Sequence, residues 1–189
     1  MGLDISVVTN LREVEVPKEI EIYSDEYYDW QREEYPFEDI WALGQVGNYD
    51  QDRYGDYPPG TYISENITGF RAGSYSGYGE WRNTLAKVGA GFAGGSDEAW
   101  RHDGEDYPFE ELINYSDADG YIAAPITDKL CNDFVSFEKE MTDVVDKAWL
   151  KIHPTIELTG EDKDWFLAKW DNWKDAMCAA SGNGAVIFH

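Results

Sequence analysis

The clearest pattern in the chain is the recurrence of hydrophobic residues three and four positions apart in its last third. Such spacing places side chains on one face of a helix, so it predicts a long helix over residues 127–150, ended by Pro154. It predicts a second helix over residues 161–181, which Thr159 and Asp162 would begin as a capping box. The two hydrophobic faces comprise Leu130, Phe134, Phe137, Met141, Val144, Val145 and Ala148, and then Phe166, Trp170, Trp173, Met177 and Ala180.

Strand patterns lie at the two ends of the chain. Residues 3–9 and 185–188 are rich in β-branched and apolar residues, and residues 19–23 alternate acidic and apolar positions, so each run predicts a strand. Shorter helices are expected over residues 36–43, 79–88, 96–100 and 108–114. We therefore expect one α+β domain over residues 1–189, with one mainly antiparallel sheet and the two long C-terminal helices packed on it.

The charge of the chain narrows the choice of partners. The 189 residues include 38 acids and 15 bases, for a net charge of −23, and residues 1–60 alone hold 15 acids and 4 bases. Such a field repels nucleic acid and anionic membranes and attracts basic protein surfaces. We therefore expect a basic surface of another protein as the partner, with no direct nucleic-acid or membrane binding. Adaptation to high salt is the alternative, and it would scatter the charge over the whole surface.

The acids are interleaved with aromatic residues over residues 24–60, which we expect to form an extended segment or insertion. Duplex DNA carries one negative charge per about 1.7 Å of its axis, so ordered carboxylates on this segment can imitate DNA in the channel of a DNA-handling protein. Aromatic side chains would add burial to such a contact. The predicted partner-binding residues are Asp25, Glu26, Asp29, Glu33, Glu34, Tyr35, Glu38, Asp39, Asp50, Asp52 and Asp56.

A glycine-rich stretch, Phe-Arg-Ala-Gly-Ser-Tyr-Ser-Gly-Tyr-Gly-Glu-Trp-Arg over residues 70–82, suggests a second function. Its glycines permit positive φ, so backbone N–H groups could converge on an anion beside the guanidinium fork of Arg71. The chain would then bind or hydrolyse a nucleotide signal. The structural alternative is that Arg71 and Arg82 pair with nearby acids while the tyrosines pack on the sheet. The predicted ligand-binding residues are Arg71, Ser74, Tyr75, Asp117, Asp119 and His189.

No motif in the chain supports a catalytic, cofactor or metal site. Residues 89–94 match G-x-G-x-x-G, but a predicted helix precedes them where a dinucleotide site needs a strand. The three histidines lack metal-ligand spacing. We therefore expect no cofactor, no metal and a binding protein more than an enzyme.

The two cysteines and the first residues of the chain suggest the cellular compartment of the protein. Cys131 and Cys178 lie in apolar-periodic segments, where we expect buried free thiols and no disulfide. The first residues lack the basic and apolar regions of a signal peptide, and no apolar run reaches the roughly 20 residues of a membrane span. We therefore expect a cytoplasmic protein.

Four segments together resemble a group of phage and prophage proteins. They are the opening Met-Gly-Leu-Asp, the run Phe-Arg-Ala-Gly-Ser-Tyr-Ser-Gly-Tyr at residues 70–78, the run Glu-Leu-Ile-Asn-Tyr-Ser-Asp-Ala-Asp-Gly at residues 111–120, and a Trp-rich helix followed by Gly-Ala-Val-Ile-Phe-His. The resemblance covers most of the chain except residues 24–60. It implies a phage context and supplies no catalytic residue, because no activity is established for the group. In that context the acidic segment would neutralise a host defence or DNA-handling protein.

Overall fold

The computed structural model describes residues 2–43, 60–102, 104, 106–115, 120–138 and 160–189, and their strands form two antiparallel sheets. The four-stranded sheet has the order β5 (Asn66–Ser74), β1 (Gly2–Thr9), β7 (Gly184–Phe188) and β6 (Gly120–Ala123). The three-stranded sheet has the order β2 (Arg12–Val14), β4 (Gly60–Ser64) and β3 (Asp39–Leu43). The α+β class is confirmed, and the strands are divided between two sheets where the sequence predicted one.

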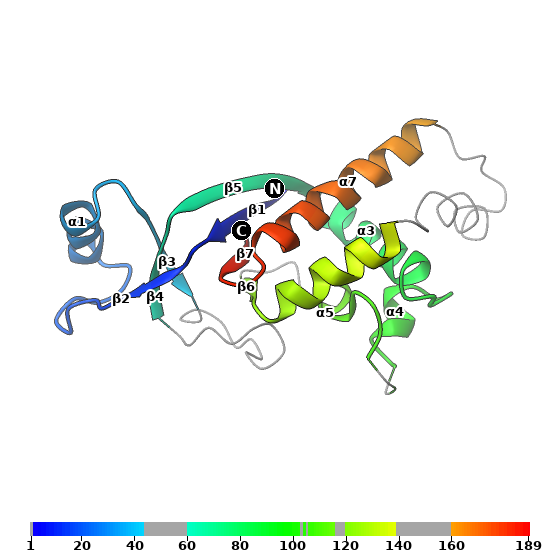
Figure 1. Ribbon diagram of the computed structural model, residues 1–189, viewed down its shortest axis with the longest axis horizontal. Coiled ribbons are helices and arrows are strands. Elements are labelled where there is room, and N and C mark those ends of the chain that lie inside the picture. Colours follow the sequence, from blue (N-terminus) through cyan, green and yellow to red (C-terminus); the bar gives the residue numbers. More distant parts are fainter. Residues whose placement is uncertain (1, 44–59, 103, 105, 116–119, 139–159) are drawn as a thin grey trace.

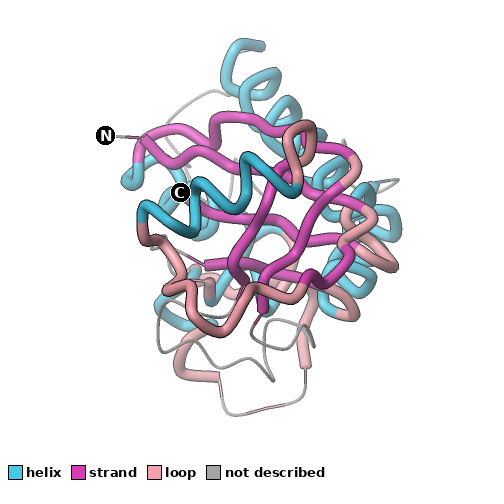
Figure 2. The backbone as a smooth tube through the Cα atoms, turned by 90° about the vertical axis from the view of Figure 1, so that its left-hand side faces the viewer, coloured by secondary structure: helices cyan, strands magenta, loops and turns pink. Residues whose placement is uncertain are grey.

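A single antiparallel ribbon connects the two sheets. β1 pairs with β5, and β2 pairs with β4 in the same register, so that Ile5 lies opposite Phe70 and Arg12 lies opposite Ile63. The ribbon bends at Asn10, whose φ of 54° is a left-handed conformation that asparagine tolerates better than most residues. The ribbon carries the three-stranded sheet away from the helices (Figure 1), and Figure 2 shows the strands, in magenta, from the side on which that sheet lies.

The central strand β7 is buried on both faces, which explains its unbroken apolar run. Val186 and Phe188 face the main hydrophobic core under the helices. Ala185 and Ile187 face a smaller cluster that includes Tyr62 from the three-stranded sheet. The predicted strands over residues 3–9 and 185–188 are confirmed, and the two lie side by side in the four-stranded sheet.

Helices cover the other side of the main core (Figure 1). They are α3 (Tyr75–Val88), α4 (Ser96–Ala99), α5 (Glu110–Asn114), residues 126–138 and α7 (Gly160–Ala179). Both predicted C-terminal helices pack on the sheet, as expected. The part of the first predicted helix that follows residue 138 lies outside the described residues, as does the predicted cap at Thr159. None of the described helices combines the length and apolar character that crossing a membrane requires.

Aromatic side chains fill the main core. Trp173 of α7 is 1% exposed and stacks on Trp81 of α3, with ring centroids 5.3 Å apart. It also contacts Phe70 of β5 at 5.1 Å and Phe188 of β7 at 5.7 Å. Because one indole touches α3, β5 and β7 together, Trp173 ties the helices to the sheet.

Cys131 and Cys178 form a disulfide, so the prediction of two free thiols is wrong. The bond joins the helix of residues 126–138 to α7, across a sequence separation of 47 residues. Both cysteines are partly buried, where apolar periodicity predicted full burial. The periodicity could not show that the two helices would lie against each other at those positions. The expectation of a reducing cytoplasm therefore loses the support that free thiols gave it.

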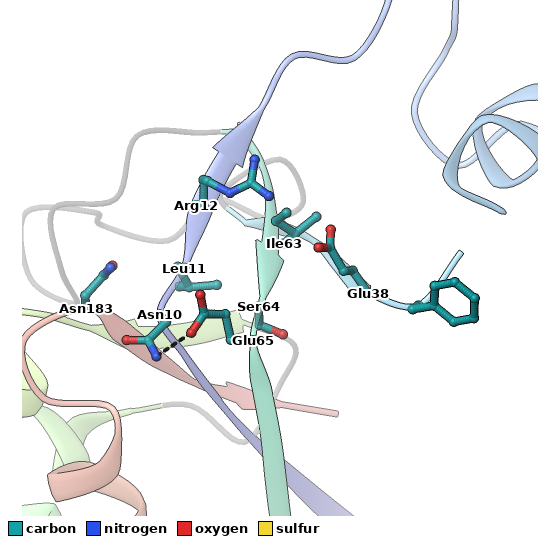
Figure 3. A pocket seen from close by; sticks show the side chains of 9 residues that line it. Asn10, Leu11, Arg12, Glu38, Ile63, Ser64, Glu65 and Asn183 are labelled. Atoms are coloured by element: carbon teal, nitrogen blue, oxygen red, sulfur yellow. Dashed lines mark hydrogen bonds between the residues drawn. The ribbon is translucent and has the colours of Figure 1, made fainter. Parts of the chain in front are cut away.

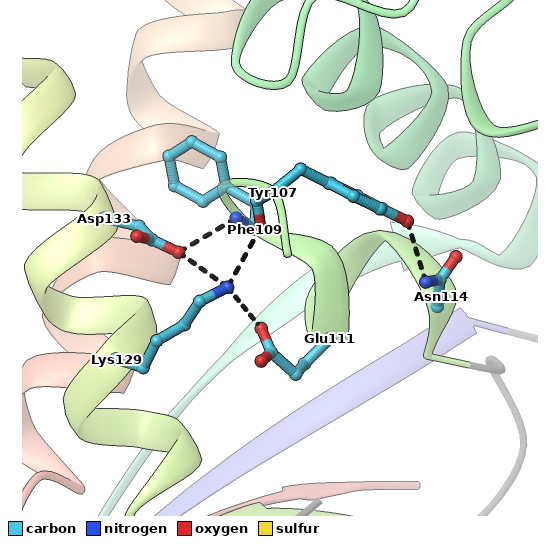
Figure 4. Close-up of polar contacts among 6 residues, drawn as sticks. All are labelled: Tyr107, Phe109, Glu111, Asn114, Lys129 and Asp133. Carbon is cyan, nitrogen blue, oxygen red and sulfur yellow. Dashed lines mark hydrogen bonds and ion pairs between the residues drawn. The ribbon is translucent and has the colours of Figure 1, made fainter. Parts of the chain in front are cut away.

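Lys129 joins three elements through polar contacts (Figure 4). Its Nζ donates to the Glu111 carboxylate at 2.7 Å and to the Tyr107 carbonyl at 3.2 Å, and it lies 3.1 Å from Asp133. Asp133 in turn accepts the Phe109 N–H at 2.9 Å. Burial lowers the pKa of Lys129, but the neighbouring carboxylates outweigh this effect and raise the pKa above its ordinary value.

Two local predictions are wrong. Residues 19–23 form turns instead of a strand, closed by hydrogen bonds such as the Ser24 N–H to the Glu21 carbonyl at 3.0 Å. Residues 36–43 contain strand β3 instead of a helix, since Asp39–Leu43 pair with β4. The spacing of Phe37, Ile40 and Trp41 suits a helix, yet backbone pairing with β4, a strand distant in sequence, decides the structure.

Candidate functional site

The predicted acidic segment contains a well-defined helix. α1 (Asp25–Glu34) begins at Ser24, whose hydroxyl accepts the Tyr27 N–H at 3.1 Å as an N-cap. Asp25 and Glu26 stand in the first turn, where carboxylates interact favourably with the helix dipole. The description of residues 24–60 as extended is therefore wrong for this part. Residues 24–39, which we call the acidic tip, lie at the end of the molecule farthest from the helices of the main core (Figure 1).

An aromatic cluster holds α1 in place. Tyr27 is 1% exposed, and its ring lies 6.1 Å from Tyr23, 5.7 Å from Tyr28 and 5.8 Å from Trp30. The partly buried Tyr35, which the sequence assigned to partner binding, packs edge-on against Trp30 at 5.5 Å. The rings provide the burial that gives this short helix a fixed surface.

Every predicted acid in the described part of the segment is exposed. These residues are Asp25, Glu26, Asp29, Glu33, Glu34, Glu38 and Asp39. Among the described ion pairs, only one involves the tip, between Arg32 and Asp29, and both of its side chains are largely exposed. Asp50, Asp52 and Asp56 lie outside the described residues. The tip therefore presents seven carboxylates to solvent with a single base among them.

Exposed aromatic rings accompany these carboxylates. Phe37, in the turn between α1 and β3, is 97% exposed, and Tyr28 is 43% exposed. Leaving a phenylalanine ring in water forgoes roughly 1.5–3 kcal/mol of burial. Protein interfaces commonly use such a ring as an anchor inside a polar rim. Sequence reasoning missed Phe37 because it placed this ring on a helix face.

A groove of about 620 Å³ lies between the acidic tip and the bend of the ribbon (Figure 3). Phe37 and Glu38 line one side, while Asn10, Ser64 and Glu65 line the bend. Asn10 donates to the Glu65 carboxylate at 2.9 Å. The other lining residues are Leu11, Arg12, Ile63 and Asn183. The groove is mostly polar, so it suits the rim of a contact with another protein more than an apolar ligand.

The predicted anion-binding loop over residues 70–82 does not exist as a loop. Residues 70–74 belong to β5, and Tyr75 begins α3. Ser74 is the N-cap of α3, with its hydroxyl accepting the Gly77 N–H at 3.0 Å, and Tyr75 is 38% exposed. Gly77 and Gly79 lie within the helix, so a nest built from these glycines is ruled out.

Arg82 is structural, as the alternative interpretation expected, but its partners are carbonyls and not acids. It is 8% exposed and donates to the Ile113 carbonyl at 3.3 Å and to the Tyr115 carbonyl. These two hydrogen bonds fix α3 against the end of α5. Within α3, the guanidinium also lies 4.9 Å from the centre of the Tyr78 ring, a cation–π contact one helical turn away.

Two predicted ligand residues that are distant in sequence, Arg71 and His189, lie on either side of strand β1. Arg71 of β5 stands opposite Asp4 of β1, with 3.9 Å between guanidinium and carboxylate. His189 exchanges backbone hydrogen bonds with Asp4 and places its Nε2 3.0 Å from the hydroxyl of Ser6. Asp117 and Asp119 lie outside the described residues. In the part of the chain that the structure describes, no group of three or more His, Cys, Asp or Glu side chains could hold a metal ion.

Comparison of the chain with protein-family models, with curated proteins and with solved structures finds no match.

Proposed function

We propose that the protein is an acidic binding protein that neutralises another protein by covering a basic surface with its acidic tip. The observation that carries this proposal is the combination of seven exposed carboxylates with the 97% exposed ring of Phe37. In a phage context the target is a host defence or DNA-handling protein, and the tip takes the place of DNA in its channel.

The chemistry of the tip suits fast capture of a basic partner. Opposite charge steers two proteins together and raises the association rate, whereas a buried aromatic anchor slows dissociation. The aromatic cluster under α1 fixes the positions of its carboxylates before binding. Binding therefore costs less ordering entropy than it would for a disordered acidic tail.

The test is capture from a bacterial lysate followed by elution with duplex DNA. We expect the immobilised protein to retain a basic DNA-handling protein that duplex DNA displaces, since both would occupy the same channel. Phe37→Ala should reduce retention at least tenfold. Val135→Ala, which removes another exposed apolar side chain far from the tip in sequence, should leave it unchanged. Retention that duplex DNA fails to displace would contradict DNA mimicry.

A second candidate function is binding of a nucleotide or a similar small anion near Arg71 and His189. The observation that favours it is their placement on either side of Asp4, with Ser6 within hydrogen-bond distance of His189. Isothermal titration with nucleotides tests this function directly. Arg71→Ala should abolish the heat of binding without lowering the unfolding temperature, and an equal loss of stability would make Arg71 structural.

A further inference from the structure

The outer edge of β5 is a second surface with its own chemistry. β5 ends the strand order of the four-stranded sheet, and among the described residues no strand pairs with its outer edge. The strand is nine residues long and forms one border of the sheet (Figure 1). Its residues from Asn66 to Gly69 are exposed. Such an edge presents unpaired N–H and C=O groups to any strand that can approach it.

This edge is also unusual in its charge. Between Glu65 and Glu80 the chain has no carboxylate, although it has 38 acids in 189 residues. The only charge in that interval is Arg71, whose side chain is 66% exposed. Asp175 of α7 lies near Thr68 and Gly69, but the strand itself carries no acid. A second acidic chain therefore meets less repulsion along β5 than at the acidic tip, to which a basic partner would be drawn.

We propose that β5 pairs antiparallel with β5 of a second copy of this chain, in the register that places Thr68 opposite Thr68 of the second copy. That register places Arg71 opposite Glu65 and Ile67 opposite Gly69 on the other chain. The two four-stranded sheets then form one continuous sheet across a twofold axis.

The side chains fit this register. Ile67 is 39% exposed and would lie over Gly69, which leaves room because it has no side chain. Gly69 is required within the monomer as well, since a Cβ there would collide with the carbonyl oxygen of Ile5. Arg71 is only loosely paired with Asp4, at 3.9 Å, so its guanidinium retains donors for a carboxylate of the second copy. Glu65 uses only one of its two oxygens to accept from Asn10.

The end of β5 limits how far the pairing extends. The Lys169 Nζ from α7 donates to the Ala72 carbonyl, and Gly73 has a φ of 116° beside an irregularity in the β1–β5 register. These features remove the last residues of β5 from a regular edge. Pairing is therefore confined to residues 65–71, and so short an interface gives a weak, concentration-dependent dimer.

The first test is sedimentation velocity over a range of protein concentrations and salt. We expect a monomer–dimer equilibrium that strengthens as salt rises, because salt screens the repulsion between two chains of charge −23. Binding of a basic partner by the acidic tip changes with salt in the opposite direction, so failure of either proposal can be told from failure of the other. A monomer at every concentration and salt would overturn the dimer.

Charge exchange tests the register. In this register residue 71 of each copy faces residue 65 of the other, so the dimer contains two such pairs. Arg71→Glu makes both pairs acidic and Glu65→Arg makes both pairs basic. Each variant should therefore weaken dimerisation roughly tenfold or more. The double variant carrying both changes should restore it. Equal weakening by the single and double variants would contradict this register, provided that thermal unfolding shows all three to be folded.

A crosslink provides a check that does not depend on those charges. Thr68→Cys should form a disulfide-linked dimer when oxidised glutathione is added, because the two residues face each other at the axis. Ala93→Cys, an exposed position away from the edge, is the matched control and should stay monomeric. Equal crosslinking of the two variants would show random collision and would overturn the pairing at Thr68.

Discussion

The two ends of the molecule use charged side chains in different ways. Around the main core, two lysines are paired with acids: Lys129 contacts Glu111 and Asp133, and Lys174 contacts Glu138 at 2.7 Å. On the acidic tip, Arg32 is the one basic residue among seven exposed carboxylates, and it pairs with Asp29. Contacts within the fold account for these two lysines, whereas the described contacts pair only Asp29 among the carboxylates of the tip. The difference supports the proposal that the acidity of the tip serves contact with a partner.

The aromatic residues of the two regions show the same contrast. Trp173 is 1% exposed and packs against several rings of the core, whereas Phe37 is 97% exposed. Replacing Trp173 with Ala should cost about 3–5 kcal/mol of unfolding free energy, because it leaves a cavity where three elements meet. Phe37→Ala should change that free energy by less than about 0.5 kcal/mol. Urea denaturation of both variants measures the two values, and similar losses would break the comparison.

The disulfide should be the next largest contributor to stability in the helical region. Closing a separation of 47 residues restricts the unfolded chain, so reduction should lower the free energy of unfolding by about 2–4 kcal/mol. Denaturation with and without dithiothreitol measures this loss. The double variant Cys131→Ser, Cys178→Ser should be insensitive to the reductant. If the wild-type protein were insensitive too, the two cysteines would not be joined in solution.

Lys129 should give the helical region a stability that depends on pH. Its pKa is raised by folding, so its contribution is complete below the ordinary value of 10.5 and is lost as pH rises through the folded pKa. Lys129→Met should cost about 1–2 kcal/mol at pH 7, and its deficit relative to wild type should shrink above pH 10.5. Denaturation at pH 7, 9 and 11 tests this. A deficit that stays constant across this range would assign the loss to packing alone.

The smallest expected effect on stability is that of the tip carboxylates. Changing Glu26, Glu33, Glu34 and Glu38 to Gln should alter the unfolding temperature by less than about 2 °C, because exposed charges contribute little. A small rise is the expected sign, since the substitutions relieve repulsion between like charges. A large fall, measured by differential scanning calorimetry, would show that these carboxylates hold the tip together and are not free for a partner.

Prediction from the sequence succeeded where the pattern of hydrophobic residues along one helix or strand indicates which side chains are buried. The buried face of α7 was predictable because hydrophobic residues recur at the helical period, and β7 was predictable from its unbroken apolar run. It failed over residues 36–43, where the helical spacing is accidental and pairing with β4 decides the structure. It failed at the cysteines, because nothing near either residue shows which helices will meet.

The same limit applies to the candidate sites. The exposure of the acids followed from composition, since carboxylates are rarely buried without partners. The exposure of Phe37 did not, because it depends on the turn between α1 and β3. The proximity of Arg71 and His189 arises from the strand order β5–β1–β7, which brings residues 118 positions apart to either side of Asp4.

The most direct measurement compares two variants of equal charge for binding to the protein captured from the lysate. One carries the four tip substitutions, and the other carries Glu80→Gln, Asp97→Asn, Asp106→Asn and Asp164→Asn at exposed positions outside the tip. Both have a net charge of −19 in place of −23. If the tip is the binding surface, the tip variant should bind at least tenfold more weakly and with a shallower dependence on salt, while the control should bind like wild type. Equal weakening of the two variants would contradict a localised site and would assign binding to net charge alone.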